Sequence, residues 1–381
     1  MSQIQQPTTT GPGTERPAPS VRQLSFQWAG GPAIPLLSVV IALIIGAIFV
    51  LFSGNDPVAA YAALFTGAFG TPYDITETLV SAIPLVLTGL AVAIAFRTGL
   101  FNIGAQGQLL VGALAAGWAG SQFASLPGFV LMPIVILFGI AGGAFYGGIV
   151  GFLKAVRGVN EVITTIMLNY TIVFVMHWLL QAGPMTAQNA FGTPASTPIG
   201  AGARLPVIVP NELVLFSRLH AGLILAGLAV LVFWFLLWRT PLGYRLRAVG
   251  LGARAAAQAG IDPARHMILV MAIAGGFAGL GGMIEVSGVF GRVYDGFSSS
   301  YGFDAIAVAL LGKNSPLGIV FAALLFGAFV HGGAYMQSHA GISSNLVAII
   351  QAFVLFVIAA EALVRRLARP RGARRPVEAI A

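Results

Sequence analysis

The chain has no cysteine, and only 8% of its 381 residues are charged. Without cysteine it cannot form a disulfide, use thiol catalysis or bind a metal through sulfur. Soluble domains carry about 25% charged residues, so this composition argues against one. The five histidines show no ligand spacing, and neither a His-Glu-x-x-His pair nor a Gly-x-Ser-x-Gly elbow occurs. We therefore expect no metal site and no enzyme activity.

A phosphate loop is missing as well. Residues 312–315 read Gly-Lys-Asn-Ser, but Ala307 stands where the motif requires glycine, and Asn314 follows the lysine. We therefore predict no nucleotide site in this chain and no cofactor of its own.

Apolar residues dominate the chain instead, at 57% of the total, and the mean hydropathy is +0.89. A span needs about 20 apolar residues, so the length allows roughly ten. We predict an all-α integral membrane protein with about ten transmembrane helices, in a domain covering residues 31–365. The expected spans lie near residues 35–52, 76–96, 104–120, 129–152, 160–181, 219–238, 266–289, 301–312, 316–334 and 344–363.

Charge fixes the expected orientation. With ten crossings, every lysine and arginine except Arg204, Arg218 and Arg292 falls on one side of the membrane. The positive-inside rule makes that side cytoplasmic. Residues 1–30 are then a disordered cytoplasmic tail, 366–381 form a basic cytoplasmic tail, and the net charge of +8 reflects topology rather than nucleic-acid binding.

The most informative stretch is Arg97-Thr-Gly-Leu-Phe-Asn-Ile-Gly-Ala-Gln-Gly-Gln-Leu109, between two apolar runs. In lipid, unpaired backbone groups and amide side chains are costly. The stretch therefore predicts a helix interrupted near 101–108 at membrane depth, which indicates transport. An ordinary interfacial loop remains the alternative. A second interruption at 301–312 follows a full span in the same way, so an inverted repeat is possible.

Two other spans carry patterns. Glycines at 139, 143, 147 and 151 are four apart and predict a groove for close helix packing. Glu161, Thr165 and Asn169 are also four apart, so they share one face of the fifth span. That face could line a pathway or the subunit core, while Glu161 could instead pair with Arg157 at the membrane boundary.

Two loops are long enough to have a role. Residues 182–218 lie outside and could cap the pathway, contact a partner or simply connect two spans. In the inner loop 239–265, residues 253–259 favour a short helix that ends at Gly260. Such a helix could meet a cytoplasmic motor, or the loop could only fix topology and attract anionic lipid.

Four segments resemble permease subunits of bacterial ABC importers, within the group that handles branched-chain amino acids, simple sugars and nucleosides. They are Gly99-Leu-Phe-Asn-Ile-Gly-Ala-Gln-Gly-Gln108, the segment 158–170, the loop 243–263 and Gly302-Phe-Asp-Ala-Ile-Ala-Val-Ala-Leu-Leu-Gly312. The resemblance covers about residues 35–365 and is closest to the nucleoside branch, in which Glu often replaces Gln106.

The resemblance implies an inner-membrane subunit with both termini cytoplasmic, a second permease, a cytoplasmic ATPase that binds ATP, and an external substrate-binding lipoprotein. Asn102, Gln106, Gln108, Glu161 and Asn169 would line or brace the solute path, since uncharged amides suit a neutral solute such as a nucleoside. Arg245, Arg247, Gly252, Arg254 and Gly260 would couple the chain to the ATPase. A sugar or branched-chain amino acid permease is the nearest alternative, and an ion-coupled transporter using Glu161, Glu285 or Asp304 is a more distant one.

Overall fold

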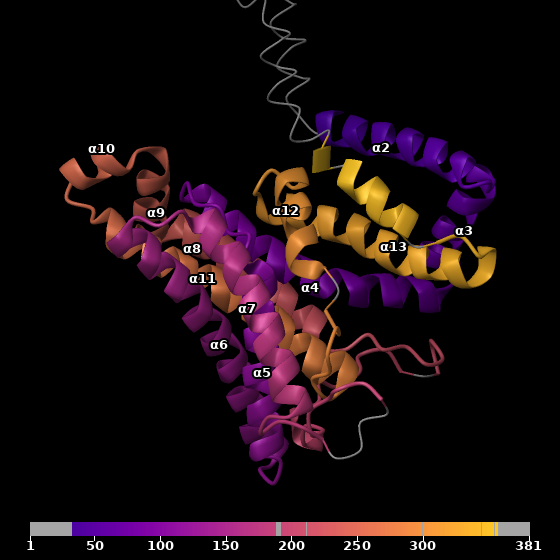
Figure 1. The fold of residues 1–381 in the computed structure, drawn as a ribbon, viewed down its shortest axis with the longest axis horizontal. Helices are drawn as coiled ribbons and strands as arrows, with labels where there is room; N and C mark the ends of the chain where they lie inside the picture. The colour runs from indigo at the N-terminus through magenta and orange to yellow at the C-terminus, as the bar shows by residue number, and fades with distance from the viewer. Residues whose placement is uncertain are drawn as a thin grey trace, which may run out of the picture.

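The computed structural model describes residues 33–187, 192–210, 212–298, 300–343, 345–353 and 355–356. Within these residues the chain is helical, with isolated bridges in place of strands (Figure 1). Both predicted tails and the end of the last expected span lie outside the described residues. The all-α class is confirmed.

The helices follow one another as expected from the apolar runs, with two additions. α3 and α9 were not anticipated, because α3 is too short for a span and α9 lies within the loop 239–265. The elements are α2 Ala33–Phe52, α3 Pro57–Phe69, α4 Pro72–Arg97, α5 Ala105–Gln122, α6 Gly128–Arg157, α7 Glu161–Gln181, η1 Ala201–Ala203, α8 Gly222–Arg239, α9 Pro241–Leu251, α10 Ala253–Gln258, α11 Pro263–Ile284, η2 Glu285–Phe290, α12 Tyr301–Leu311 and α13 Pro316–Ala340.

Four of the apolar helices begin at a polar cap followed by proline. Asp56, Thr71, Asp262 and Ser315 each accept a backbone N–H with the side chain, and proline occupies the first position after each of them. The cap satisfies an otherwise unpaired donor, and proline has no donor to lose there. The local sequence therefore determines where α3, α4, α11 and α13 start.

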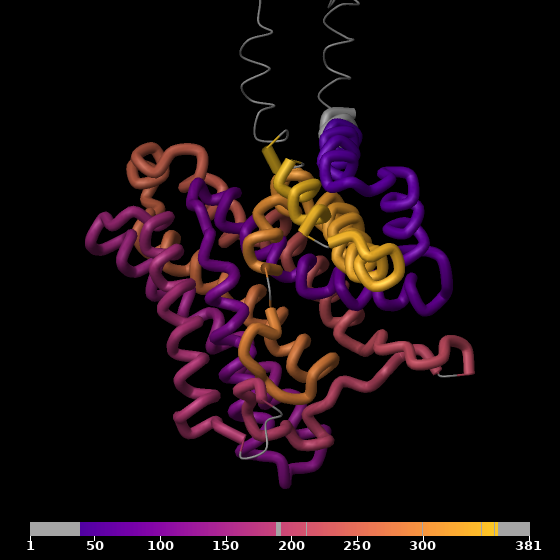
Figure 2. The backbone as a smooth tube through the Cα atoms, turned by 45° about the vertical axis from the view of Figure 1, so that its right-hand side comes forward, coloured from indigo at the N-terminus to yellow at the C-terminus, as the bar shows by residue number. Residues whose placement is uncertain are grey.

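Six helices in the described part of the chain are long and apolar enough to cross a membrane: α4, α6, α7, α8, α13, and α11 continued by the π-helical η2. Three further apolar helices are shorter: the part of α2 from Val39 to Phe52, α3 and α12. Figures 1 and 2 show α5, α6, α7 and α11 on one side and α2, α3 and α13 on the other. α4 is buried along nearly its whole length, because it packs against α11, α12 and α13.

The glycine stripe of α6 packs directly on α11, as its spacing predicted. A Cβ atom at Gly143 would collide with the backbone oxygen of Gly275, and one at Gly151 would lie 2.7 Å from the Cα atom of Ile268. Gly139 and Gly147 meet the same helix. The two backbones therefore lie in close contact from Gly139 to Gly151, about three helical turns, which only glycine permits.

The described part of residues 182–218, which the charge pattern predicts to be external, folds onto the ends of neighbouring helices. Its Ser196 N–H donates to Val293 (2.7 Å), Gly200 N–H donates to Gly120 (2.9 Å), and Leu205 N–H donates to Ser287 (2.9 Å). It thus covers the ends of α5 and η2.

Candidate functional site

The interruption predicted between α4 and α5 is present. α4 ends at Arg97, Gly99 takes a positive φ of 77°, and α5 starts at Ala105 after Gly104. Leu100 and Asn102 are buried, at 3% and 0% exposure, so the connecting segment enters the protein rather than lying on its surface.

Gln106 joins this interruption to the second one. Its Nε2 atom donates to the backbone oxygen of Ser298 (3.0 Å) and to the Ser298 Oγ atom (3.2 Å). Its Oε1 atom accepts from the N–H of Gly302 (2.8 Å), in the first turn of α12. The buried side-chain amide of Gln106, in the first turn of α5, therefore hydrogen-bonds to backbone groups at the N-terminal end of α12.

The other two amides of the segment pair with each other. Asn102 Nδ2 donates to Gln108 Oε1 (2.9 Å), and Gln108 Nε2 donates to Asn102 Oδ1 (3.0 Å). Gln108 is 1% exposed. This reciprocal bond fixes the shape of the seven-residue connection and leaves little of either amide free for a solute.

Asn169 attaches the same segment to α7. Its Oδ1 atom accepts from the N–H of Gly107, and its Nδ2 atom donates to the oxygen of Ile103, both at 2.9 Å. The structure brings the four amides close together. In this conformation the four amides have a structural role, because their hydrogen bonds hold α5, α7 and α12 together. We call this group of buried amides the polar core.

Glu161 is the first residue of α7, eight positions before Asn169 on the same helix. Its carboxylate pairs with Lys154 of α6 at 2.8 Å, not with Arg157 as the sequence had allowed. Both groups sit at the ends of helices predicted to reach the cytoplasmic side. The pair therefore closes the α6–α7 turn.

The depth of the polar core follows from α4. Thr88, in the middle of that helix, donates to the backbone oxygen of Tyr301 (3.3 Å), while Arg97 at its C-terminal end donates to the oxygen of Asn314 (3.0 Å). α12 runs between these two levels and is about 16 Å long at 1.5 Å per residue. That is half of a bilayer core of about 30 Å, so α12 is a half-helix that does not span it alone.

An ionic cluster near the N-terminal end of α4 was not anticipated. Glu77 in α4 is 1% exposed and forms a bidentate pair with Arg218 of the 182–218 segment. That hydrogen-bonded carboxylate raises the pKa of the Arg218 guanidinium above its ordinary value. His220 Nε2 and Ser287 Oγ lie close by without a hydrogen-bond partner. The only sign of this cluster in the sequence was that Glu77 is an acidic residue within an apolar run.

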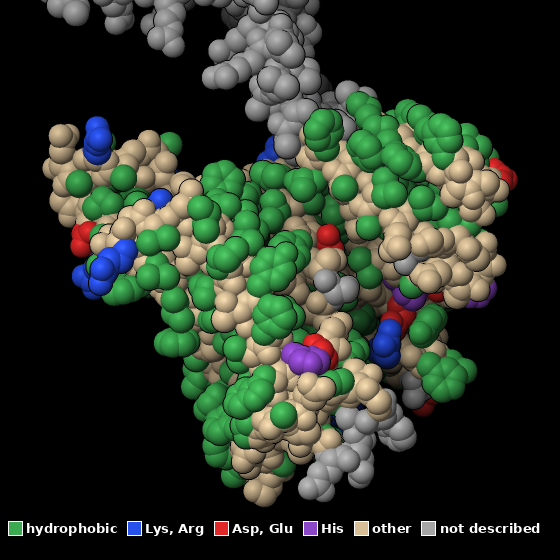
Figure 3. All heavy atoms as spheres, viewed as in Figure 1, with side chains coloured by type: hydrophobic (Ala, Val, Ile, Leu, Met, Phe, Trp, Pro, Cys, Tyr) green, Lys and Arg blue, Asp and Glu red, His purple; other side chains and the backbone are tan. Residues whose placement is uncertain are grey.

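The expected cytoplasmic helix is present as α10, but α9 precedes it. Gly252 separates the two helices, and Gly260, with a φ of 80°, ends α10. Arg245 and Arg254 are exposed, whereas Arg247 is half-buried and donates to the oxygen of Gly243 (3.4 Å). Figures 1 and 3 show α9 and α10 projecting from one end of the apolar body, with basic side chains at the projection.

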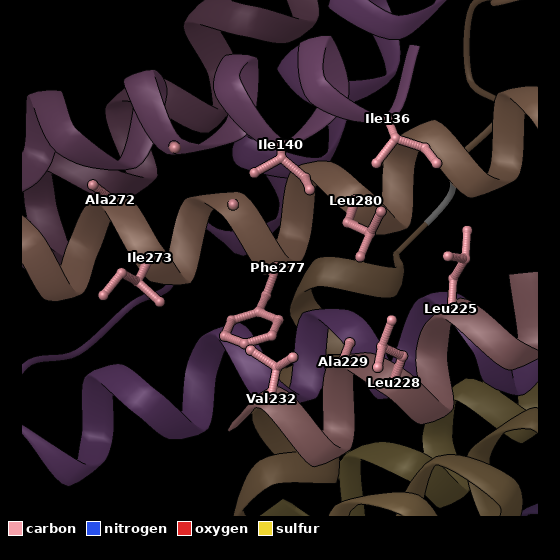
Figure 4. A pocket seen from close by; sticks show the side chains of 12 residues that line it. Ile136, Ile140, Leu225, Leu228, Ala229, Val232, Ala272, Ile273, Phe277 and Leu280 are labelled. Atoms are coloured by element: carbon pink, nitrogen blue, oxygen red, sulfur yellow. The ribbon is translucent and has the colours of Figure 1, made fainter. Parts of the chain in front are cut away.

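A separate cavity of about 470 Å³ lies between α6, α8 and α11 (Figure 4). Apolar side chains line it, among them Ile140, Val232 and Phe277. It offers no hydrogen-bonding side chain, so it does not suit a polar solute.

These features define a polytopic helical membrane protein with interrupted helices in its core, as solute transporters have. Residues 74–359 match the family described as "Branched-chain amino acid transport system / permease component". The chain belongs to this family of permeases.

Three curated relatives are similar over much of the chain. The guanosine ABC transporter permease protein NupP of Bacillus subtilis is 38% identical over 333 residues, which are 87% of this chain and 94% of NupP. The glucose ABC transporter permease protein TsgB13 of Haloferax volcanii is 40% identical over 334 residues, 86% of this chain and 87% of TsgB13. A second guanosine permease of Bacillus subtilis, NupQ, is 29% identical over 255 residues, 66% of this chain and 79% of NupQ.

Proposed function

We propose that the chain is the translocation subunit of an ATP-driven importer and moves a nucleoside-type solute across the cytoplasmic membrane by alternating access. The observation that supports this proposal is the Gln106 bridge. It joins two interrupted helices at the level of Thr88, near the middle of α4, and a transporter needs backbone at such a depth that can open around a solute. The chain would bind no ATP itself.

A neutral, hydroxylated solute fits the polar core best. The residues around the interruptions are amides and hydroxyls rather than paired charges. The names of NupP and NupQ favour a nucleoside, and that of TsgB13 keeps glucose as the second candidate. The family description adds branched-chain amino acids as a third.

The motor would dock on α9 and α10. Leu251 is 93% exposed and Tyr244 is 64% exposed on this cytoplasmic projection, next to exposed Arg245 and Arg254. Exposed apolar and basic side chains outside the membrane are typical of a partner surface. We assign it to a separate ATPase subunit.

Two further partners complete the assembly. A second permease is supported by the likeness of this chain to both NupP and NupQ of one organism. An external lipoprotein would deliver the solute to the side that carries residues 182–218. Both termini would be cytoplasmic, in keeping with the distribution of Lys and Arg.

Reconstituted vesicles test the proposal. We expect uptake of labelled guanosine to require this chain, the second permease, the ATPase with ATP, and the lipoprotein. Equal uptake by this chain without the ATPase would overturn it. Loss of uptake on collapsing a proton gradient at constant ATP would favour an ion-coupled transporter instead, and competition by glucose or leucine would identify the other two solutes.

A further inference from the structure

Asp304 differs from the other acids at membrane depth. Glu77 pairs with Arg218, Glu161 pairs with Lys154, and Glu285 is closed off at 3% exposure. Asp304 is partly exposed, and within the described residues its carboxylate accepts a single hydrogen bond, from Ser300 Oγ at 2.7 Å. An ionised carboxylate can accept about four hydrogen bonds, so most of its capacity is free.

Its position makes this free capacity informative. Asp304 lies in the first turn of the half-helix α12, which begins at the depth of Thr88. Gly302 and Ala305 are buried against the protein, whereas the adjacent Phe303 is 46% exposed. A carboxylate facing hydrocarbon is costly, so this side of α12 faces a polar path or a partner subunit.

We infer that Asp304 accepts hydrogen bonds from the neighbouring hydroxyl groups of the solute as it passes the middle of the membrane. The inference rests on the proposed function and names the group that selects the solute. The nearby amides already hold each other and the backbone. An acidic side chain on a pair of ribose hydroxyls is a common arrangement in nucleotide-binding folds. The solute class is therefore one with vicinal hydroxyls, a ribonucleoside or a sugar.

The test uses the complete reconstituted transporter and initial uptake rates at saturating solute and lipoprotein. Guanosine is compared with 2′,3′-dideoxyguanosine, which lacks both hydroxyls, in the wild type and in Asp304→Asn. We expect the substitution to slow guanosine uptake about tenfold, the factor equivalent to 1.4 kcal/mol, and to change dideoxyguanosine uptake less than about twofold. A residue with only a structural role would slow both solutes equally.

Asp56→Asn is the matched control. Asp56 caps α3 at an exposed position, where Asn caps equally well, so both rates should stay at the wild-type level. Equal effects of Asp304→Asn on the two solutes, or no effect on either, would overturn the inference and leave the permease function intact. If only sugars are imported, glucose and 2,3-dideoxyglucose replace the nucleosides. Import of leucine alone would also overturn it, whereas absence of any ATP-dependent uptake would refute the proposed function itself.

Discussion

Replacing Gln106 with leucine should weaken the contact between the two interrupted helices and lower the stability of the protein. The side chain is 5% exposed and makes three hydrogen bonds, two to Ser298 and one to Gly302. Leucine has a similar size but leaves these groups unpaired inside the membrane. Hydrogen bonds between membrane helices contribute about 0.6–1.7 kcal/mol each, so the loss amounts to about 2–5 kcal/mol.

The assay is unfolding of the purified protein in mixed micelles of dodecylmaltoside and sodium dodecyl sulfate, followed by circular dichroism. We expect Gln106→Leu to unfold at a clearly lower fraction of sodium dodecyl sulfate than the wild type. Gln122→Leu, at the exposed end of the same helix, is the control and should leave the midpoint unchanged. If both variants unfold together with the wild type, Gln106 does not brace the core, and the reasoning fails.

Three other substitutions probe separate parts of the fold. Arg218→Ala leaves the buried Glu77 carboxylate unpaired, so the free energy of unfolding should fall by about 1–3 kcal/mol, less than for a fully buried pair because the Arg218 side chain is 54% exposed to solvent. Adding Glu77→Gln should recover part of the loss, and the same micelle titration measures both. Gly143→Val pushes α6 away from α11, so no folded protein should elute as a single peak in size-exclusion chromatography, and a wild-type profile would contradict the backbone contact. Leu251→Asp should leave the chain folded but weaken its binding to the ATPase subunit by about tenfold or more in a pull-down titration, whereas unchanged binding would exclude α9 as the docking site.

Much of the architecture follows from local sequence. Apolar runs mark the long helices, polar caps followed by proline mark where several of them begin, and the glycine stripe of α6 predicts close packing on another helix, which the structure identifies as α11. These features depend on residues within a few turns of one another. The interruption before Ala105 was also predictable, because it contains glycines and amides between two apolar runs.

The partners of the polar residues were not predictable. Gln106 bonds to residues 192 and 196 positions away, and Glu77 meets Arg218 across 141 positions. Such pairs depend on how whole helices pack, which periodicity does not encode. The amides were therefore identified as a group, but the sequence could not show that they hold one another.

The contact of α6 with α11 has a mechanical consequence. Interlocked backbones cannot slide past each other, since every step would drive one main chain into the other. These two helices must therefore move as one rigid body in any conformational change of the protein. Conformational change must then occur at contacts where helices are joined by single side chains.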